Sequence, residues 1–170
     1  MSAMLRSPLN RGLACVGALF AALALCGCGF TPLYAARGVS PGLSAIAVNA
    51  PHGRTAFLLS QDLEDSLARD RSVAPAYRLD LTLEQQNYPR GLQINDVATH
   101  NETHVNVGYH LVDLATGKVV KAGDERVEVT YGVAAQPYAG VSAEKDAEAR
   151  AASTAADRIR LDLAVYFAQR

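Results

Sequence analysis

Cysteine is scarce in this chain of 170 residues, and all three cysteines (Cys15, Cys26 and Cys28) lie near its N-terminus. No thiol remains after Cys28. This excludes a disulfide framework, a cysteine-ligated metal site and a cysteine nucleophile in the body of the protein. Tryptophan is absent altogether. We therefore expect the fold to be stabilised by side-chain packing.

An excess of positive charge is also missing. The chain has 16 lysines and arginines against 17 aspartates and glutamates, which gives a formal net charge of −1 with histidine neutral. Nucleic-acid binding needs a basic surface, and this balance does not favour one. We expect no nucleic-acid partner.

The usual patterns of catalysis and cofactor binding do not occur. No serine stands in a Gly-x-Ser-x-Gly elbow, and no glycine pattern of a phosphate-binding loop is found. His100 and His104 are four residues apart, but on a strand this spacing separates them by about 13 Å, too far to share a metal ion. We expect no enzyme activity, no metal and no other cofactor.

The apolar run near the N-terminus is too short for a comfortable membrane span. It extends from Leu13 to Leu25 and follows the basic residues Arg6 and Arg11. A transmembrane helix needs about 20 apolar residues. A short basic region followed by a short apolar region is typical of a secretory signal peptide.

The signal ends in Leu25-Cys26-Gly27-Cys28, which has the form of a lipobox. The small Gly27 precedes the acceptor Cys28, and the aliphatic Leu25 stands three residues before it. Cys26 fits poorly as the acceptor, because the large Leu25 would then lie at the cleavage site. We expect residues 1–27 to be a lipoprotein signal peptide and Cys28 to carry the lipid that holds the protein on the membrane.

Removing 27 of the 170 residues leaves 143, the size of one domain. Arg6 and Arg11 leave with the signal, so 14 basic residues face 17 acidic ones, a net charge of −3. Gly29 follows the lipidated cysteine where an aspartate would favour the inner membrane. We expect a lipid-anchored protein on the periplasmic side of the outer membrane, with residues 28–42 as lipidated N-terminus and linker and 43–170 as the folded domain.

Hydrophobic periodicity predicts the first half of that domain. Leu43 to Ala50 alternates as a strand. Apolar residues at helical spacing predict an amphipathic helix from Thr55 to Asp70. Strict period-two alternation from Tyr77 to Glu84 predicts a half-buried second strand, and Pro89-Arg90-Gly91 is expected to break it.

The second half reads as a hairpin followed by a long helix. Apolar residues alternate from His104 to Leu111 and again within Val119 to Val133, with a tight turn between them. Ser142 is expected to cap a helix that runs to Phe167. Its expected buried stripe consists of Ala152, Ala155, Ile159, Leu163 and Tyr166.

These elements predict an α+β fold with the order β-α-β-β-β-α. Both helices need an apolar surface to cover. We therefore expect a two-layer sandwich, in which a roughly four-stranded, mostly antiparallel sheet carries two helices on one face. The other sheet face is expected to be polar and uncovered.

Four ordered features together resemble one known family. They are Cys28-Gly29-Phe30-Thr31-Pro32-Leu33-Tyr34, the Tyr77-x-Leu79-x-Leu81 strand, Tyr109-x-Leu111-x-Asp113 with Thr116-Gly117, and the terminal run from Tyr138-Ala139 through Asp146 to Arg150. In this combination the chain is similar to LptE, the lipopolysaccharide-assembly lipoprotein, and most similar to its alphaproteobacterial branch. The resemblance implies an α+β plug inside the LptD β-barrel that assists barrel assembly and lipopolysaccharide delivery to the outer leaflet.

Two basic residues are candidate contacts for the anionic lipopolysaccharide. Arg90 has no acidic residue nearer in sequence than Glu84 and Asp96, and Lys145 stands near the start of the terminal helix. Both resemble basic positions at one end of the family's domain.

The alternative function is an auxiliary lipoprotein of an envelope lipid-transport ABC system, which would have an inner-membrane permease as its partner.

Replacing Cys28 with alanine should abolish lipidation and signal cleavage, because the acceptor thiol is removed. Intact-mass measurement of the purified wild type should give a lipidated mature chain that begins at Cys28. A mature N-terminus at Cys26, or an uncleaved chain without lipid, would refute the assignment.

Overall fold

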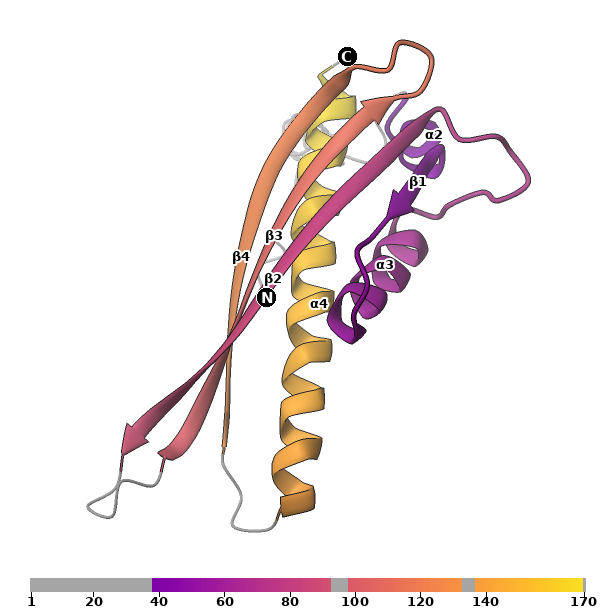
Figure 1. The fold of residues 1–170 in the computed structure, drawn as a ribbon. Helices are drawn as coiled ribbons and strands as arrows, with labels where there is room; N and C mark the ends of the chain where they lie inside the picture. The colour runs from indigo at the N-terminus through magenta and orange to yellow at the C-terminus, as the bar shows by residue number, and fades with distance from the viewer. Residues whose placement is uncertain (1–37, 93–97, 133–136, 170) are drawn as a thin grey trace, which may run out of the picture. The chain divides into compact units, whose positions relative to one another are not determined.

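The computed structural model describes residues 38–92, 98–132 and 137–169. All of these residues belong to one compact unit, Leu33–Arg170. The signal peptide, Cys28 and the linker up to residue 37 lie outside the described residues. The described residues form these elements, labelled as in Figure 1: α2 (Val39–Ser44), β1 (Ile46–Asn49), α3 (Arg54–Ser66), β2 (Tyr77–Leu92), β3 (Ala98–Asp113), β4 (Val119–Gly132) and α4 (Pro137–Ala168).

The strands form one sheet in the order β1-β2-β3-β4. β1 lies parallel to β2, whereas the β2–β3 and β3–β4 pairs are antiparallel. Helices α3 and α4 pack on each other and on the same face of this sheet. The predicted α+β sandwich with a mostly antiparallel four-stranded sheet is confirmed, with α2 as an additional short helix.

The core lies between the sheet and the two helices. Alternate residues of the strands, such as Leu79 and Leu111, are fully buried in the same core cluster as Leu59 and Leu63 of α3. On α4, four residues of the predicted stripe (Ala152, Ala155, Ile159 and Leu163) are buried, and Tyr166 is partly buried. The alanines let α4 lie close to the strands, because they place almost no side chain between the helix and the sheet.

The predicted boundary between the linker and the first strand is wrong. Val39–Ser44 is a helix, so the linker ends before residue 39 and the strand begins only at Ile46. No side chain caps this helix. It is instead held by burial of Val39 and Leu43 and by Gly42, where a Cβ atom would come within 2.6 Å of the Phe167 ring. Tertiary contacts of this kind leave no local signal in the sequence.

Three other predicted boundaries need correction. α3 ends at Ser66 and not at Asp70, because Ala68 takes a left-handed backbone conformation with φ of 50°. β2 does not end before Pro89 but continues to Leu92. Only its first four residues pair with β1, so one edge of β2 is open at Pro89. A proline, which has no N–H to donate, is tolerated on such an open edge. α4 begins at Pro137, so Ser142 lies inside the helix and caps nothing.

The described helices include none that is both long enough and apolar enough to cross a membrane.

A partly buried polar contact connects α4 to the sheet. The Tyr109 hydroxyl donates to the Asp162 carboxylate, and Lys121 forms an ion pair with the same group at 2.8 Å. Burial, followed by this hydrogen bond, raises the pKa of Tyr109. Burial opposes ionisation of Asp162, but hydrogen bonds from Lys121 and Tyr109 outweigh it and lower the pKa of the carboxyl. The contact is therefore between a neutral tyrosine and an ionised aspartate.

Gly123 is needed beside Tyr109, since a Cβ atom there would lie 2.3 Å from the hydroxyl oxygen. Gly123→Ala should lower the free energy of unfolding by about 1–3 kcal/mol through overpacking, measured by urea titration of the purified protein. Gly132→Ala on the same strand is the matched control, because a Cβ atom there meets nothing within 4 Å. Equal stability of the two variants would contradict the expected steric conflict.

Candidate functional site: the uncovered sheet face

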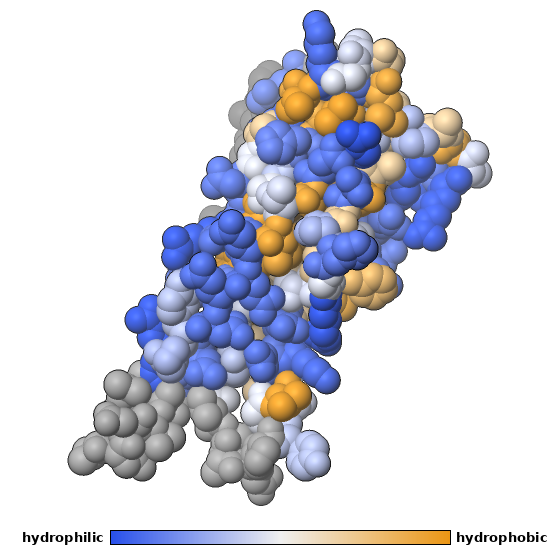
Figure 2. Space-filling view, in the orientation of Figure 1, coloured by the Kyte–Doolittle hydropathy of each residue, from blue (hydrophilic) through white to orange (hydrophobic). Residues whose placement is uncertain are grey.

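The even-numbered residues of β2 and β3, and those of β4 from Ala122 onward, point away from the helices. The strand register brings them together on one face, where Arg78 lies opposite Val112 and Arg90 opposite His100. Most of these side chains are polar or charged, and Figure 2 shows hydrophilic residues over much of the strands. No helix among the described elements covers this face. The predicted polar, uncovered face is therefore present.

Three arginines on this face pair with carboxylates of the same face. Arg78 pairs with Asp80 at 2.8 Å. Arg90 pairs with Glu102 at 2.9 Å, and Arg126 with Glu128 at 2.9 Å. The hydrogen bond from Arg78 lowers the pKa of Asp80, and hydrogen bonds from Arg90 and then His104 lower the pKa of Glu102. The face thus holds ionised groups with partners of its own.

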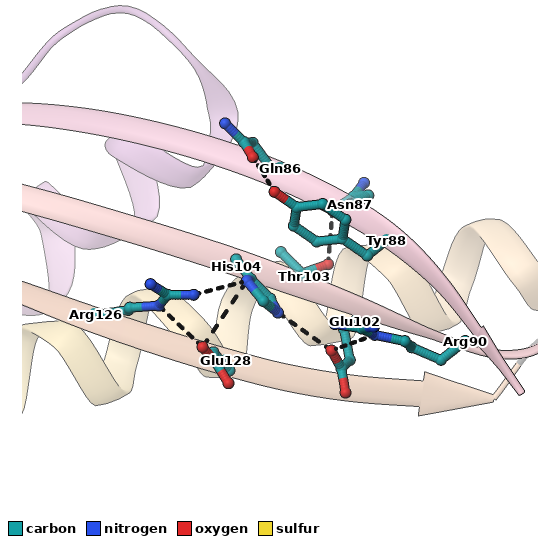
Figure 3. Close-up of polar contacts among 9 residues, drawn as sticks. All are labelled: Gln86, Asn87, Tyr88, Arg90, Glu102, Thr103, His104, Arg126 and Glu128. Atoms are coloured by element: carbon teal, nitrogen blue, oxygen red, sulfur yellow. Dashed lines mark hydrogen bonds and ion pairs between the residues drawn. The ribbon is translucent and has the colours of Figure 1, made fainter.

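His104 is the centre of this network and is buried although it lies on the uncovered face (Figure 3). Its Nδ1 lies 3.3 Å from Nη2 of Arg126, and its Nε2 lies 3.2 Å from Glu102. Because a guanidinium only donates, Nδ1 accepts that bond, and Nε2 carries the proton that it donates to Glu102. The contacts define the tautomer of His104.

Tyr88 of β2 lies against the histidine ring, and Arg90 lies over Tyr88. The Tyr88 ring lies 4.7 Å from the His104 ring, centroid to centroid, and the Arg90 guanidinium carbon lies 5.8 Å from the centre of the Tyr88 ring. The Tyr88 hydroxyl donates to Gln86. One network of aromatic, cationic and acidic groups therefore joins all three long strands.

In the part of the chain that the structure describes, no three or more His, Cys, Asp or Glu side chains are grouped to hold a metal ion. His100, His104 and His110 all lie on β3 and share the uncovered face.

The structure places the two predicted lipopolysaccharide contacts at one end of the domain but on different sides of the sheet. Arg90 lies within β2 and not in a loop, and its pairing with Glu102 contradicts the expectation that no acidic residue is close. Lys145 lies on α4, which joins the end of β2 through a 2.9 Å hydrogen bond from Asn87 to Glu144. The third predicted residue, Cys28, lies outside the described residues.

The carboxylates around Lys145 are occupied by other groups. Glu144 accepts from Asn87, Asp146 pairs with Arg150, and Glu148 pairs with Arg54. Among the described residues no ion pair is found for Lys145. It is therefore the less neutralised of the two predicted cations.

A polar layer between α4 and the sheet was not foreseen from the sequence. Gln85 accepts a hydrogen bond from Thr55 and donates one to Glu148 at 3.1 Å, and Thr103 donates to Asn87 at 2.9 Å. The signal was present, since the alternation that begins at Tyr77 places Gln85 and Asn87 on the helix-facing side. The apolar core therefore stops short of the end of the strands.

Comparison with known proteins identifies relatives among solved structures, although no family model and no curated protein matches the chain. A protein from Caulobacter crescentus described as a lipoprotein is 40% identical, with a TM-score of 0.68, over 78% of this chain and 96% of that one.

Two more distant structures share the fold. Rare lipoprotein B from Shewanella oneidensis is 15% identical, with a TM-score of 0.55, over 71% of this chain and 92% of that one. A minor lipoprotein from Acinetobacter baumannii is 13% identical, with a TM-score of 0.55, over 71% and 90% of the respective chains. Sequence identity of 40% over nearly the whole Caulobacter crescentus protein is high enough to assign the family. The chain belongs to the same lipoprotein family as that protein.

Proposed function

We propose that this protein is an outer-membrane lipoprotein of the LptE type, which acts as plug and assembly factor of the LptD barrel in lipopolysaccharide transport. The sequence resemblance to LptE extends over the mature chain. The chain also shares its fold with rare lipoprotein B of Shewanella oneidensis. Lipid attachment at Cys28 holds the domain at the membrane in which the barrel resides.

The observation that carries the proposal is the uncovered sheet face and its internally paired charges. A barrel lumen is polar and is lined by alternate residues of its strands. A charge transferred from water to such a lumen loses hydration and needs a compensating partner. Arg78, Arg90 and Arg126 bring their own carboxylates. The face can therefore lie against a polar wall without requiring a matched charge at each position.

Depletion of the protein should lower the amount of correctly assembled barrel and of newly exported surface lipopolysaccharide together, because a plug that assists folding affects both. The lipidated protein, purified in detergent, should retain the barrel as a bound partner. Normal barrel and lipopolysaccharide levels, or co-purification of an inner-membrane permease in place of the barrel, would favour the lipid-transport ABC alternative.

Lipopolysaccharide binding should depend on Arg90 and Lys145, since an anionic glycolipid needs cations at its contact site. Arg90→Glu and Lys145→Glu should each weaken binding by about tenfold, the loss of roughly one charged hydrogen bond, while barrel assembly and thermal stability persist. Binding would be measured on the purified lipoprotein at low and moderate salt.

The matched control is Arg78→Glu, which makes the same change to an ion-paired arginine on the same strand and face. Equal losses in Arg78→Glu and Arg90→Glu would indicate a general effect of net charge. Unchanged binding at both salt concentrations would remove Arg90 and Lys145 as contacts.

A further inference from the structure

The chain contains four histidines, and three of them lie on β3. His104 differs from its neighbours on that strand, because only 11% of its side chain is exposed, whereas His100 and His110 are exposed residues. An imidazole ordinarily changes its charge between about pH 5 and about pH 8. A proton gained by His104 therefore has to be accommodated by the side chains around the ring, since little water reaches it.

In the neutral form of His104, each ring nitrogen has a suitable partner. Nε2 carries the proton and lies 3.2 Å from Glu102, while the lone pair of Nδ1 faces Nη2 of Arg126 at 3.3 Å (Figure 3). The ring of Tyr88 lies against the imidazole, with 4.7 Å between the ring centroids. Neutral His104 thus holds the Arg126 guanidinium at the centre of the uncovered face.

Charged groups from all three long strands lie around this histidine. β2 contributes Arg90, whose Nε donates to Glu102 of β3 at 2.9 Å. β4 contributes Arg126 and Glu128, which form an ion pair at 2.9 Å. The network therefore contains two cations and two carboxylates, and an added positive charge on the ring changes the balance between them.

Protonation of His104 removes the acceptor that Arg126 uses. The added proton goes to Nδ1, because Nε2 already carries one, and the new N–H points at a guanidinium that has only donors. Two cations with opposed N–H groups repel each other. Glu128 offers an alternative acceptor, since its carboxylate lies 3.9 Å from Nδ1.

The two side chains that would exchange places are exposed, whereas the strand that carries them is fixed. The side chains of Arg126 and Glu128 are 61% and 52% exposed. The backbone carbonyl of Arg126 accepts a 2.9 Å hydrogen bond from Arg158 of α4, and Val127 between the two residues is buried in the core. A rearrangement can therefore be confined to side chains and leave the sheet unchanged.

We propose that His104 is a pH-dependent switch within the uncovered face. Neutral His104 holds Arg126 at Nδ1, and protonated His104 releases Arg126 and donates to Glu128 in its place. The proton comes from the solvent, so the face gains one positive charge and no covalent bond changes. In mildly acidic solution the face then presents a guanidinium that His104 no longer holds. The switch needs only the described residues and does not require the barrel partner.

The ring nitrogen signals of histidine in nuclear magnetic resonance spectra report its tautomer and its charge directly. Spectra of the full lipidated protein, labelled with heavy nitrogen and held in detergent micelles, would be recorded from about pH 8 to about pH 5. His104→Gln would assign the signals of this residue. At the alkaline end Nε2 should carry the proton and Nδ1 should carry none. As the pH falls, Nδ1 should gain a proton, and the side-chain Nε signal of Arg126 should change with the same midpoint pH.

Two substitutions should move the midpoint pH of His104 in opposite directions. Arg126→Gln should raise it by about one unit, because a cation no longer opposes the proton on Nδ1. Glu128→Gln should lower it by about one unit, because the protonated ring loses its carboxylate. The matched control is Arg78→Gln, which removes an ion-paired arginine of the same face about 26 Å along β2 from the residue opposite His104. It should leave the midpoint unchanged.

Three results on the wild-type protein would each overturn the proposal. They are a proton on Nδ1 instead of Nε2 at the alkaline end, a His104 that gains no proton down to the acidic end, and an Arg126 signal that stays constant while His104 titrates. These results need no substitution, so they remain decisive if a variant fails to fold, which circular dichroism would show. None of the measurements involves a barrel, so they do not bear on the proposed function.

Discussion

The strict two-residue alternation of the long strands allows only one face of the sheet to be apolar, and both α3 and α4 must use it. Leu79 and Leu111 serve this shared core from neighbouring strands. The opposite face then consists of the intervening residues, which no described helix shields from water. Some of its charges pair within the sheet itself, as Arg126 does with Glu128. One sequence pattern thus produces both the core and the candidate binding surface.

Elements whose signals are local could be predicted from the sequence. The alternation from Tyr77 and the alanine-rich stripe of α4 depend only on spacing, and both are present in the structure. α2 could not be predicted in this way, because it is specified by distant contacts such as that between Gly42 and Phe167. Pro89 misled the prediction, since its effect depends on whether a neighbouring strand needs the missing N–H.

The candidate site was less accessible to sequence reasoning. Alternation places Arg90, Glu102 and His104 on one face, but only the β2–β3 register shows which residues are opposite one another. The pairing of Arg90 with Glu102, 12 positions apart in sequence, follows from that register. The burial of His104 beneath Tyr88 requires the side-chain conformations as well. Charge counting along the chain therefore misjudged which cation is neutralised.

The strands are long for a domain of this size. β2 and β3 contain 16 residues each, and at about 3.3 Å per residue this is at most about 53 Å. The apolar band of an outer-membrane barrel is only about 25 Å tall. A domain seated lengthwise in such a barrel would occupy the full height of the lumen and leave a portion of similar length beyond it. A barrel partner would then need a second, periplasmic surface to receive the remainder.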